Sequence, residues 1–146
     1  MLITQLPEAP DPSLFAIPVE LDRHTLQKRR WRATAADGRE LAIDLTDPVS
    51  HGTTLAVTET SRYEVRQSPE AVLILPLPQD PAEAARLGWF LGNQHLPVEV
   101  RSDAIWVEDA PTLADALHRH HIHHHHGTGV FLADPHSRAA GHHHHH

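Results

Sequence analysis

The chain has 146 residues, which allows one domain or two small ones. It carries 12 basic against 19 acidic residues, a formal net charge of −7 with histidine neutral. This balance argues against a nucleic-acid binder, since phosphate contacts supply most of that affinity. The absence of cysteine excludes disulfides, thiolate zinc fingers and cysteine nucleophiles. The longest apolar run is too short to span a bilayer, and no signal peptide is visible, so we expect a soluble, cytoplasmic protein without membrane contact.

The first half of the chain predicts a small β domain over residues 1–70. Residues 1–20 are rich in proline and suggest an extended lead-in. Apolar and polar residues alternate with period two over 31–35 and again over 41–45, which is the pattern of half-buried strands. An Asp-Gly dipeptide between these two segments is a tight-turn signal.

The second half predicts a ferredoxin-like βαββαβ domain over residues 71–135, so that the fold class is α+β. An N-cap followed by proline marks the start of its first helix, and a glycine marks the end. The expected elements are a strand at 72–75, a helix from Asp80 to Gly92, strands at 98–100 and 105–107, a helix beginning near Asp109, and a short last strand at Gly129 to Leu132.

Histidine content is far above the usual range. Thirteen of the 16 histidines lie between His118 and His146, mostly in the runs 118–126 and 142–146. Such tracts are typical of metal binding, because neutral imidazole is a borderline ligand that suits nickel, zinc and copper. Full protonation would move the formal charge from −7 to +9, so the tracts change character around the histidine pKa of about 6.5.

We treat residues 118–126 (the His tract) as inserted before the last strand, and residues 136–146 as a flexible His-rich tail. If the second helix continues into the tract, the pairs His120/His124 and His121/His125 lie on one face and can each chelate an ion. Flexible ligands lose entropy on binding, so each ion is held more weakly and exchanges readily, which suits storage or transfer. The candidate ligands in these segments are His118, His120, His121, His123, His124, His125, His126, His136, His142, His143, His144, His145 and His146.

Two further interpretations concern the isolated histidines and the end of the chain. The terminal run 142–146 is either native or a remnant of an expression tag. His95 lies in a turn after the first helix of the second domain, where an ordinary surface role competes with a metal role. A two-fold homodimer would bring two copies of His95 together, because such an interface repeats each residue.

No catalytic motif is present, so we predict no catalytic residue and no enzyme activity. The chain lacks the P-loop, H-E-x-x-H, G-x-S-x-G and G-x-G-x-x-G patterns. A metalloenzyme would need a concave pocket with an open coordination position, and a flexible ligand tract argues against one.

Three segments resemble the urease accessory protein E (UreE) family of nickel metallochaperones. The segment Trp89 to Val100 contains Gly-Asn-Gln-His, similar to a Leu-Gly-Asn-Arg-His segment in the family, with Gln94 where arginine is usual. Arg32 to Ala42 resembles the N-terminal β domain of the family. Phe131 to Pro135 is similar to the segment before its His-rich tail.

The resemblance implies a homodimer with an N-terminal peptide-binding domain and a ferredoxin-like metal domain. It implies that His95 binds Ni(II) at the dimer interface. Zinc and copper are expected competitors, because copper binds histidine sites more tightly than nickel in the general order of divalent affinities. It also implies delivery of nickel to apo-urease alongside an accessory GTPase complex. Some members carry further ligand histidines where this chain has Glu108-Asp109-Ala110, so extra ligands would come from the tract and tail.

Two alternatives stay open at this point. The chain is either a nickel carrier with a delivery role or a nickel or zinc storage protein without one. The basic stretch Arg23 to Arg32 is either a solvated strand face or a contact for an acidic protein partner, which the net charge favours over nucleic acid.

Overall fold

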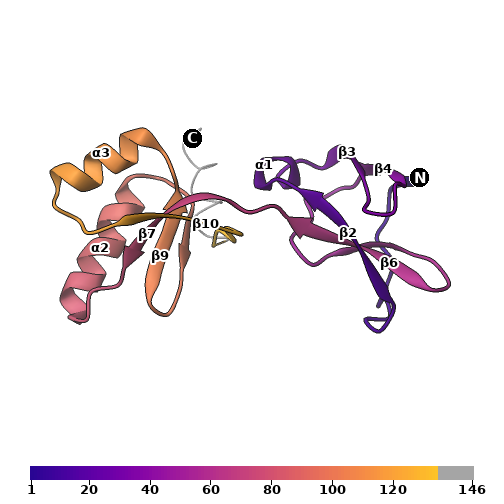
Figure 1. Cartoon of the computed structure of the whole chain (residues 1–146), viewed down its shortest axis with the longest axis horizontal. Helices are drawn as coiled ribbons and strands as arrows, with labels where there is room; N and C mark the ends of the chain where they lie inside the picture. Colours follow the sequence, from indigo (N-terminus) through magenta and orange to yellow (C-terminus); the bar gives the residue numbers. More distant parts are fainter. Residues whose placement is uncertain (135–146) are drawn as a thin grey trace. The chain divides into compact units, whose positions relative to one another are not determined.

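The computed structural model describes residues 1–134. The chain forms two compact units, Met1–Ser68 and Pro69–His146 (Figure 1). Strands and short helices mix within the described part, so the predicted α+β class is confirmed. Among residues 1–134, none of the helices has the length and apolar character that a membrane crossing would need.

The first unit contains two three-stranded sheets, with strand orders β1-β4-β3 and β2-β6-β5. Its elements are β1 (Leu2–Ile3), β2 (Phe15–Leu21), α1 (Arg23–Leu26), β3 (Arg30–Thr34), β4 (Glu40–Asp44), β5 (Thr54–Val57) and β6 (Ser61–Gln67). The predicted alternating segments correspond to β3 and β4, which pair antiparallel. The Asp-Gly dipeptide forms the turn, with Gly38 at φ 91 and Asp37 Oδ1 accepting from the Arg39 N–H at 3.0 Å.

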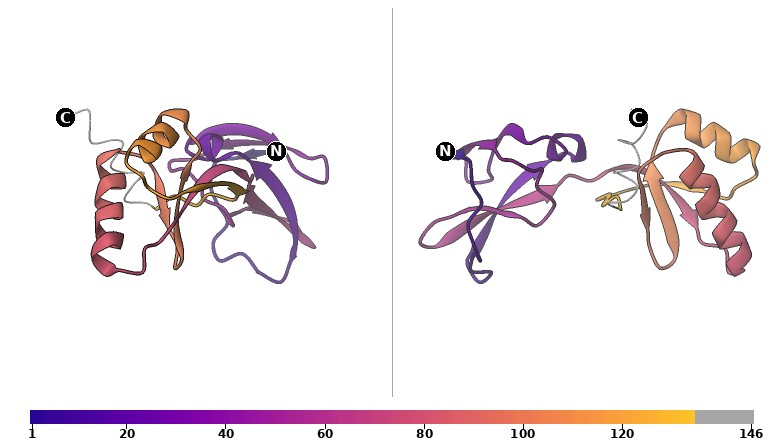
Figure 2. Two further views of the ribbon diagram at one scale, coloured as in Figure 1. Left: turned by 60° about the vertical axis from the view of Figure 1, so that its left-hand side comes forward. Right: turned by 180° about the vertical axis from the view of Figure 1, so that it is seen from behind.

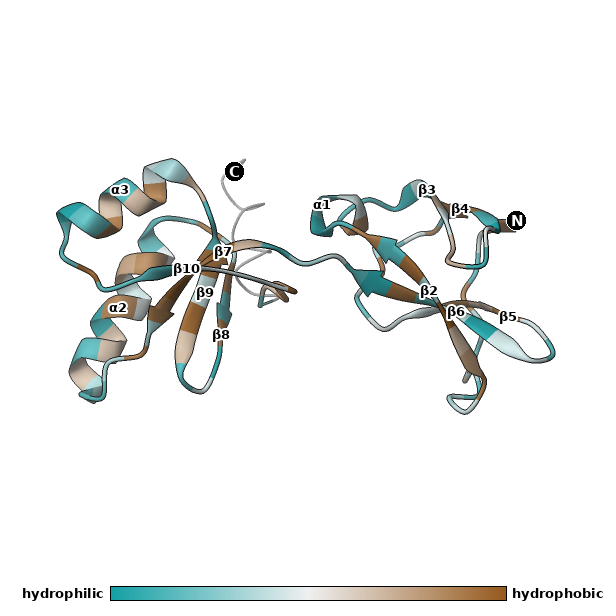
Figure 3. Ribbon diagram, in the orientation of Figure 1, coloured by the Kyte–Doolittle hydropathy of each residue, from teal (hydrophilic) through white to brown (hydrophobic). Residues whose placement is uncertain are grey.

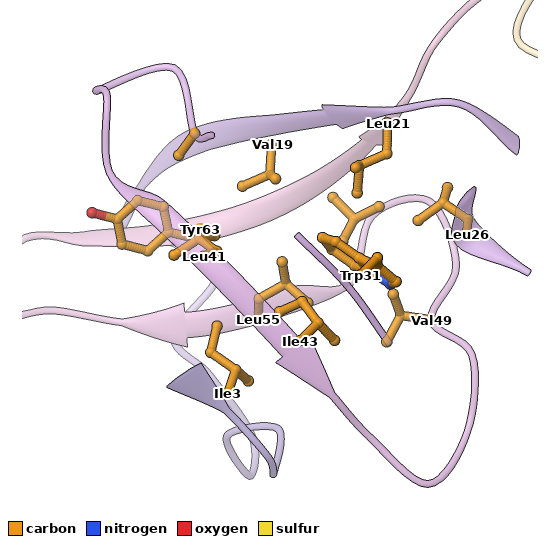
Figure 4. Close-up of a cluster of buried hydrophobic side chains, with 12 residues drawn as sticks. Ile3, Val19, Leu21, Leu26, Trp31, Leu41, Ile43, Val49, Leu55 and Tyr63 are labelled. Atoms are coloured by element: carbon orange, nitrogen blue, oxygen red, sulfur yellow. The ribbon is translucent and has the colours of Figure 1, made fainter. Parts of the chain in front are cut away.

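The two sheets of this unit bury their apolar faces against each other. Leu41 and Ile43 alternate with more exposed residues along β4 and enter the core with Trp31 from β3 (Figure 4). Tyr63 lies in the same core, and its hydroxyl donates to Asp37 Oδ2 at 2.7 Å. That bond ties β6 to the β3–β4 turn, and it lowers the pKa of Asp37.

The prediction of an extended lead-in over residues 1–20 is only partly right. Residues 2–3 form β1, and Phe15 begins β2, which pairs with β6 in parallel over seven residues. Pro18 lies inside β2, a position that proline tolerates because β2 is an edge strand and need not donate on its outer side.

The second unit has the ferredoxin-like βαββαβ order and the strand order β10-β7-β9-β8. All three strand pairs are antiparallel. Its elements are β7 (Glu70–Pro76), α2 (Pro81–Asn93), β8 (Val98–Val100), β9 (Ala104–Glu108), α3 (Pro111–Arg119) and β10 (His125–Gly129).

Both helices of this unit cover one face of its sheet (Figure 2). Leu73 and Val107 on the strands and Leu91 and Leu117 on the helices form one buried cluster. Hydrophilic and hydrophobic residues alternate along α2 and α3 in the hydropathy colouring (Figure 3). Asp80 caps α2 by accepting from the Ala82 N–H at 3.2 Å, as predicted.

The last strand is in a different place from the prediction. It begins at His125 instead of Gly129, and it pairs with β7 from Glu70 to Ile74. Both glycines of the strand lie close to neighbouring side chains: a Cβ on Gly127 would lie 2.5 Å from Cδ1 of Ile74, and one on Gly129 would lie 2.6 Å from the Trp106 ring. Two residues of the His tract, His125 and His126, therefore belong to the sheet.

After β10 the chain crosses the sheet to its opposite edge. This crossing segment, residues 130–134, contains Phe131, which is fully buried. Leu132 donates its N–H to Glu99 Oε1 at 2.8 Å, and Asp134 donates to the Val98 carbonyl at 2.7 Å. Glu99 pairs with Trp106, on the face turned away from the buried helix-facing cluster. The described chain thus ends against β8.

Candidate metal-binding site

His95 lies in the turn between α2 and β8, at a strained backbone position. Gln94 is the C-cap of α2, and His95 follows it at φ 56 with its N–H bonded to the Gly92 carbonyl at 3.2 Å. This is the left-handed position after a helix, where glycine is the usual residue and another side chain costs on the order of 1–2 kcal/mol. The side chain is exposed, so the turn presents an imidazole to the solvent.

The His tract begins with the same kind of turn. Helix α3 ends at Arg119, His120 is its C-cap, and His121 follows at φ 55. The N–H groups of His121 and Ile122 bond back to the carbonyls of His118 and Leu117, at 3.2 and 2.9 Å, which is the Schellman pattern. Ile122 packs against the apolar core, so it anchors the end of the turn.

The helix α3 therefore ends at Arg119, two residues into the tract, and the expected i, i+4 pairs do not share a helical face. Of those pairs, His120 and His121 lie in the turn, His124 lies between the turn and the last strand, and His125 begins β10. The His120 ring lies against Phe90 of α2, with ring centroids 5.0 Å apart and planes tilted by 59°.

Two tract histidines have hydrogen-bonded rings. Nδ1 of the half-buried His124 lies 2.9 Å from the Ile122 carbonyl oxygen. Nδ1 of His126 lies 3.2 Å from Oδ2 of Asp109, and the His126 side chain is 67% exposed. His118, His123 and His125 are exposed.

The contact of Asp109 with the tract was not predicted. The sequence suggested that Glu108-Asp109-Ala110 contributes no ligand, because it contains no histidine. In the structure Asp109 follows β9, and its N–H bonds to the Ala71 carbonyl at 3.4 Å. The carboxylate therefore reaches β10 across β7, a contact between residues 17 apart that no local pattern indicates.

Within residues 1–134, no three side chains of the metal-binding types come together around one point. His95 and the His tract are thus separate candidate positions, each with fewer ligands than a closed metal site needs. The predicted ligands His136 and His142 to His146 lie outside the described residues. An exposed, incomplete set of imidazoles fits a borderline divalent ion held weakly or shared with further ligands.

The class that fold and site define is a two-unit α+β protein whose ferredoxin-like unit exposes histidines. Comparison with known families refines that class. Residues 70–146 match the family model described as UreE urease accessory protein, C-terminal domain.

Curated relatives point the same way. The chain is 38% identical to the urease accessory protein UreE of Paracidovorax citrulli (strain AAC00-1), over 73% of this chain and 53% of that protein. It is 35% identical to UreE of Verminephrobacter eiseniae (strain EF01-2), over 71% and 65%, and 33% identical to UreE of Polaromonas sp. (strain JS666), over 84% and 58%. The chain belongs to the UreE urease accessory protein family. It spans between about half and two thirds of the length of these relatives.

Proposed function

We propose that this protein is a nickel carrier that binds Ni(II) through histidines and delivers it to apo-urease as the urease active site is assembled. The observation that carries the proposal is the exposed His95 at a strained turn of the unit that matches the UreE C-terminal domain. Strain at an exposed metal-ligand residue type is a recognised mark of function. Nickel is the cargo, and the protein makes and breaks no covalent bond.

The carrier acts as a homodimer in this proposal, because one imidazole cannot hold an ion firmly. A two-fold axis close to His95 would supply two imidazoles to one ion. The surface of α2 supports such a contact, since Trp89 is 72% exposed two turns before the histidine. A buried aromatic side chain is a frequent anchor of protein interfaces.

The proposed partners are apo-urease and its accessory GTPase complex, and the proposed role of the first unit is peptide binding. Each of its two small sheets ends in edge strands, and strand addition by an extended segment is one way in which such edges bind peptides. In the basic stretch, Arg23 is buried, whereas Arg30 is exposed and paired with Asp44 at 3.0 Å. The proposed compartment is the cytoplasm.

Nickel binding by equilibrium dialysis at neutral pH tests the proposal, with molar mass followed in parallel. A chain truncated after Leu117 is unsuitable, because it would lose β10 and the buried Phe131. We therefore use His95→Asn, since asparagine tolerates the left-handed position and removes the imidazole. Gln94→Ala is the control at the neighbouring C-cap.

We expect the wild-type chain and Gln94→Ala to be dimers with one tight site per dimer, and His95→Asn to lose that site. A monomeric chain, or unchanged tight binding in His95→Asn, would overturn the shared site. The storage alternative predicts many ions per chain and no effect on urease activation. A urease activation assay with and without the protein separates delivery from storage.

A further inference from the structure

Two histidines of the tract differ from their neighbours in how their rings are held. Nδ1 of His124 lies 2.9 Å from a backbone carbonyl oxygen, that of Ile122, and Nδ1 of His126 lies 3.2 Å from the Asp109 carboxylate. Within residues 1–134, the structure records no such ring bond for His123 or His125. The two bonded rings thus belong to alternate residues, 124 and 126.

The partners of these rings fix the tautomer. A carbonyl oxygen and an ionised carboxylate only accept hydrogen bonds, so Nδ1 must carry the proton in both rings. In the neutral imidazole Nε2 then carries the free lone pair, which is the form that binds metal. A carboxylate behind a ligating histidine also fixes the ring orientation and raises its basicity.

His126 lies in β10, and His124 lies one residue before the strand begins. Successive side chains of a strand point to opposite faces, so extending the alternation of β10 by one residue puts residues 124 and 126 on the same side and residue 125 on the other. Two residues along a strand span about 6.5–7 Å, a spacing over which two imidazole arms can converge on one ion. His125 pairs with Ile74, on the face opposite to that of His126 and Leu73.

We propose that His124 and His126 form a two-histidine site for Ni(II), which binds through Nε2 of each ring, and that Asp109 is its positioning residue. The inference rests on the proposed nickel-carrier function and names the part of the tract that acts as a preorganised site. Two protein ligands leave most coordination positions to water or to an acceptor protein. The ion is therefore held in a form that ligand exchange can pass on.

The test uses full-length chains in which other candidate ligands are removed. In the background chain His95 is asparagine, and His136 and His142 to His146 are alanine. One variant adds His124→Ala and His126→Ala, and its matched control adds His123→Ala and His125→Ala. Both lose two histidines with the same spacing, and nickel affinity is measured by competition with a chromophoric chelator.

We expect the 124/126 variant to bind nickel at least about tenfold more weakly than the 123/125 variant, which stays close to the background chain. Equal losses in both variants, or a background chain that binds no nickel, would overturn the inference. Nickel dialysis of the wild-type chain decides the carrier function separately, because it can succeed through His95 and the tail when this site fails.

Asp109→Ala tests the positioning role with a second readout. We expect about a tenfold loss of nickel affinity together with a loss of the single His126 tautomer in long-range ¹⁵N NMR spectra of the imidazole rings. Asp109→Glu should restore both signals in part. Backbone amide spectra of β10 report whether the strand is intact. An intact strand with an unchanged His126 tautomer in Asp109→Ala would refute the assignment.

Discussion

Replacing Phe131 by alanine tests whether the crossing segment is an integral part of the second unit. The side chain is fully buried, whereas that of its neighbour Leu132 is 44% exposed. Truncating a fully buried phenylalanine typically costs about 3–5 kcal/mol, through lost burial and the cavity left behind. Leu132→Ala should cost less than about 1 kcal/mol, because much of its side chain already contacts water.

Release of the segment limits the larger cost. Its hydrogen bonds to Val98, Glu99 and Arg101 each contribute about 0.5–1.5 kcal/mol to the stability of the segment. When the free energy lost at Phe131 exceeds the sum of these contributions, the segment detaches from the sheet and no further cost is added. We therefore expect Phe131→Ala to lower the free energy of unfolding of the second unit by about 3 kcal/mol. With a urea m-value of about 1.5 kcal/mol per molar, the midpoint falls by about 2 M.

Hydrogen exchange measured by mass spectrometry distinguishes this outcome from general loss of structure. Peptides from β8 and from the crossing segment should exchange faster in Phe131→Ala, while those of the first unit stay unchanged. A change below about 1 kcal/mol, or equal shifts for Phe131→Ala and Leu132→Ala, would refute the account of the crossing segment.

Three further outcomes follow from local contacts. Gly129→Ala should destabilise the second unit by about 1–3 kcal/mol in urea unfolding, because the new Cβ meets the Trp106 ring; unchanged stability would contradict the close approach. Tyr63→Phe should raise the pKa of Asp37 toward its usual value of 3.8 in an NMR titration, since the hydroxyl hydrogen bond is the largest cause of its lowering; an unmoved pKa would contradict this. In the wild type this bond stabilises the fold above about pH 3.8, and its contribution is lost as the pH falls through the lowered pKa of the folded state. Asp80→Ala should cost about 1 kcal/mol in thermal unfolding through the lost N-cap, and Asp80→Asn should restore most of it.

Local patterns were sufficient for most of the second unit. The N-cap at Asp80 with proline after it placed the start of α2, and alternation placed β8 and β9 within a residue or two. These signals act over a few residues, which is why they can be found without the tertiary structure. The prediction that α2 stops at Gly92 was slightly wrong, because the helix continues to Asn93.

The His tract was harder to interpret, because its order comes from contacts outside it. A run of histidines has weak preferences of its own, so composition suggested flexibility. The one local signal was Ile122, which marks the end of the helix by packing on the core after a left-handed residue. The strand that follows depends on the Gly-Thr-Gly segment fitting against Ile74 and Trp106, which are far away in sequence.

The candidate site also has one part that the sequence predicted and one part that only the structure shows. His95 was found from the turn that follows a helix, whereas its strained backbone is visible only in the structure. A helix was expected to begin near Asp109, yet the N-cap of α3 is Ala110, which makes no side-chain capping bond. The carboxylate instead meets His126, and this contact depends on the strand register of the whole sheet.

The ends of the tract limit how its length can vary. Ile122 packs against the apolar core, and Gly127 lies close to Ile74 in the sheet, so the histidines 123–126 connect two packed positions. Deleting or inserting one of them leaves a run of histidines that looks unchanged in composition. It would nevertheless stretch or buckle this connection and invert which side each ring takes. Although the segment 123–126 looks like a simple repeat whose length could vary, the packed residues at its two ends favour a length of four residues.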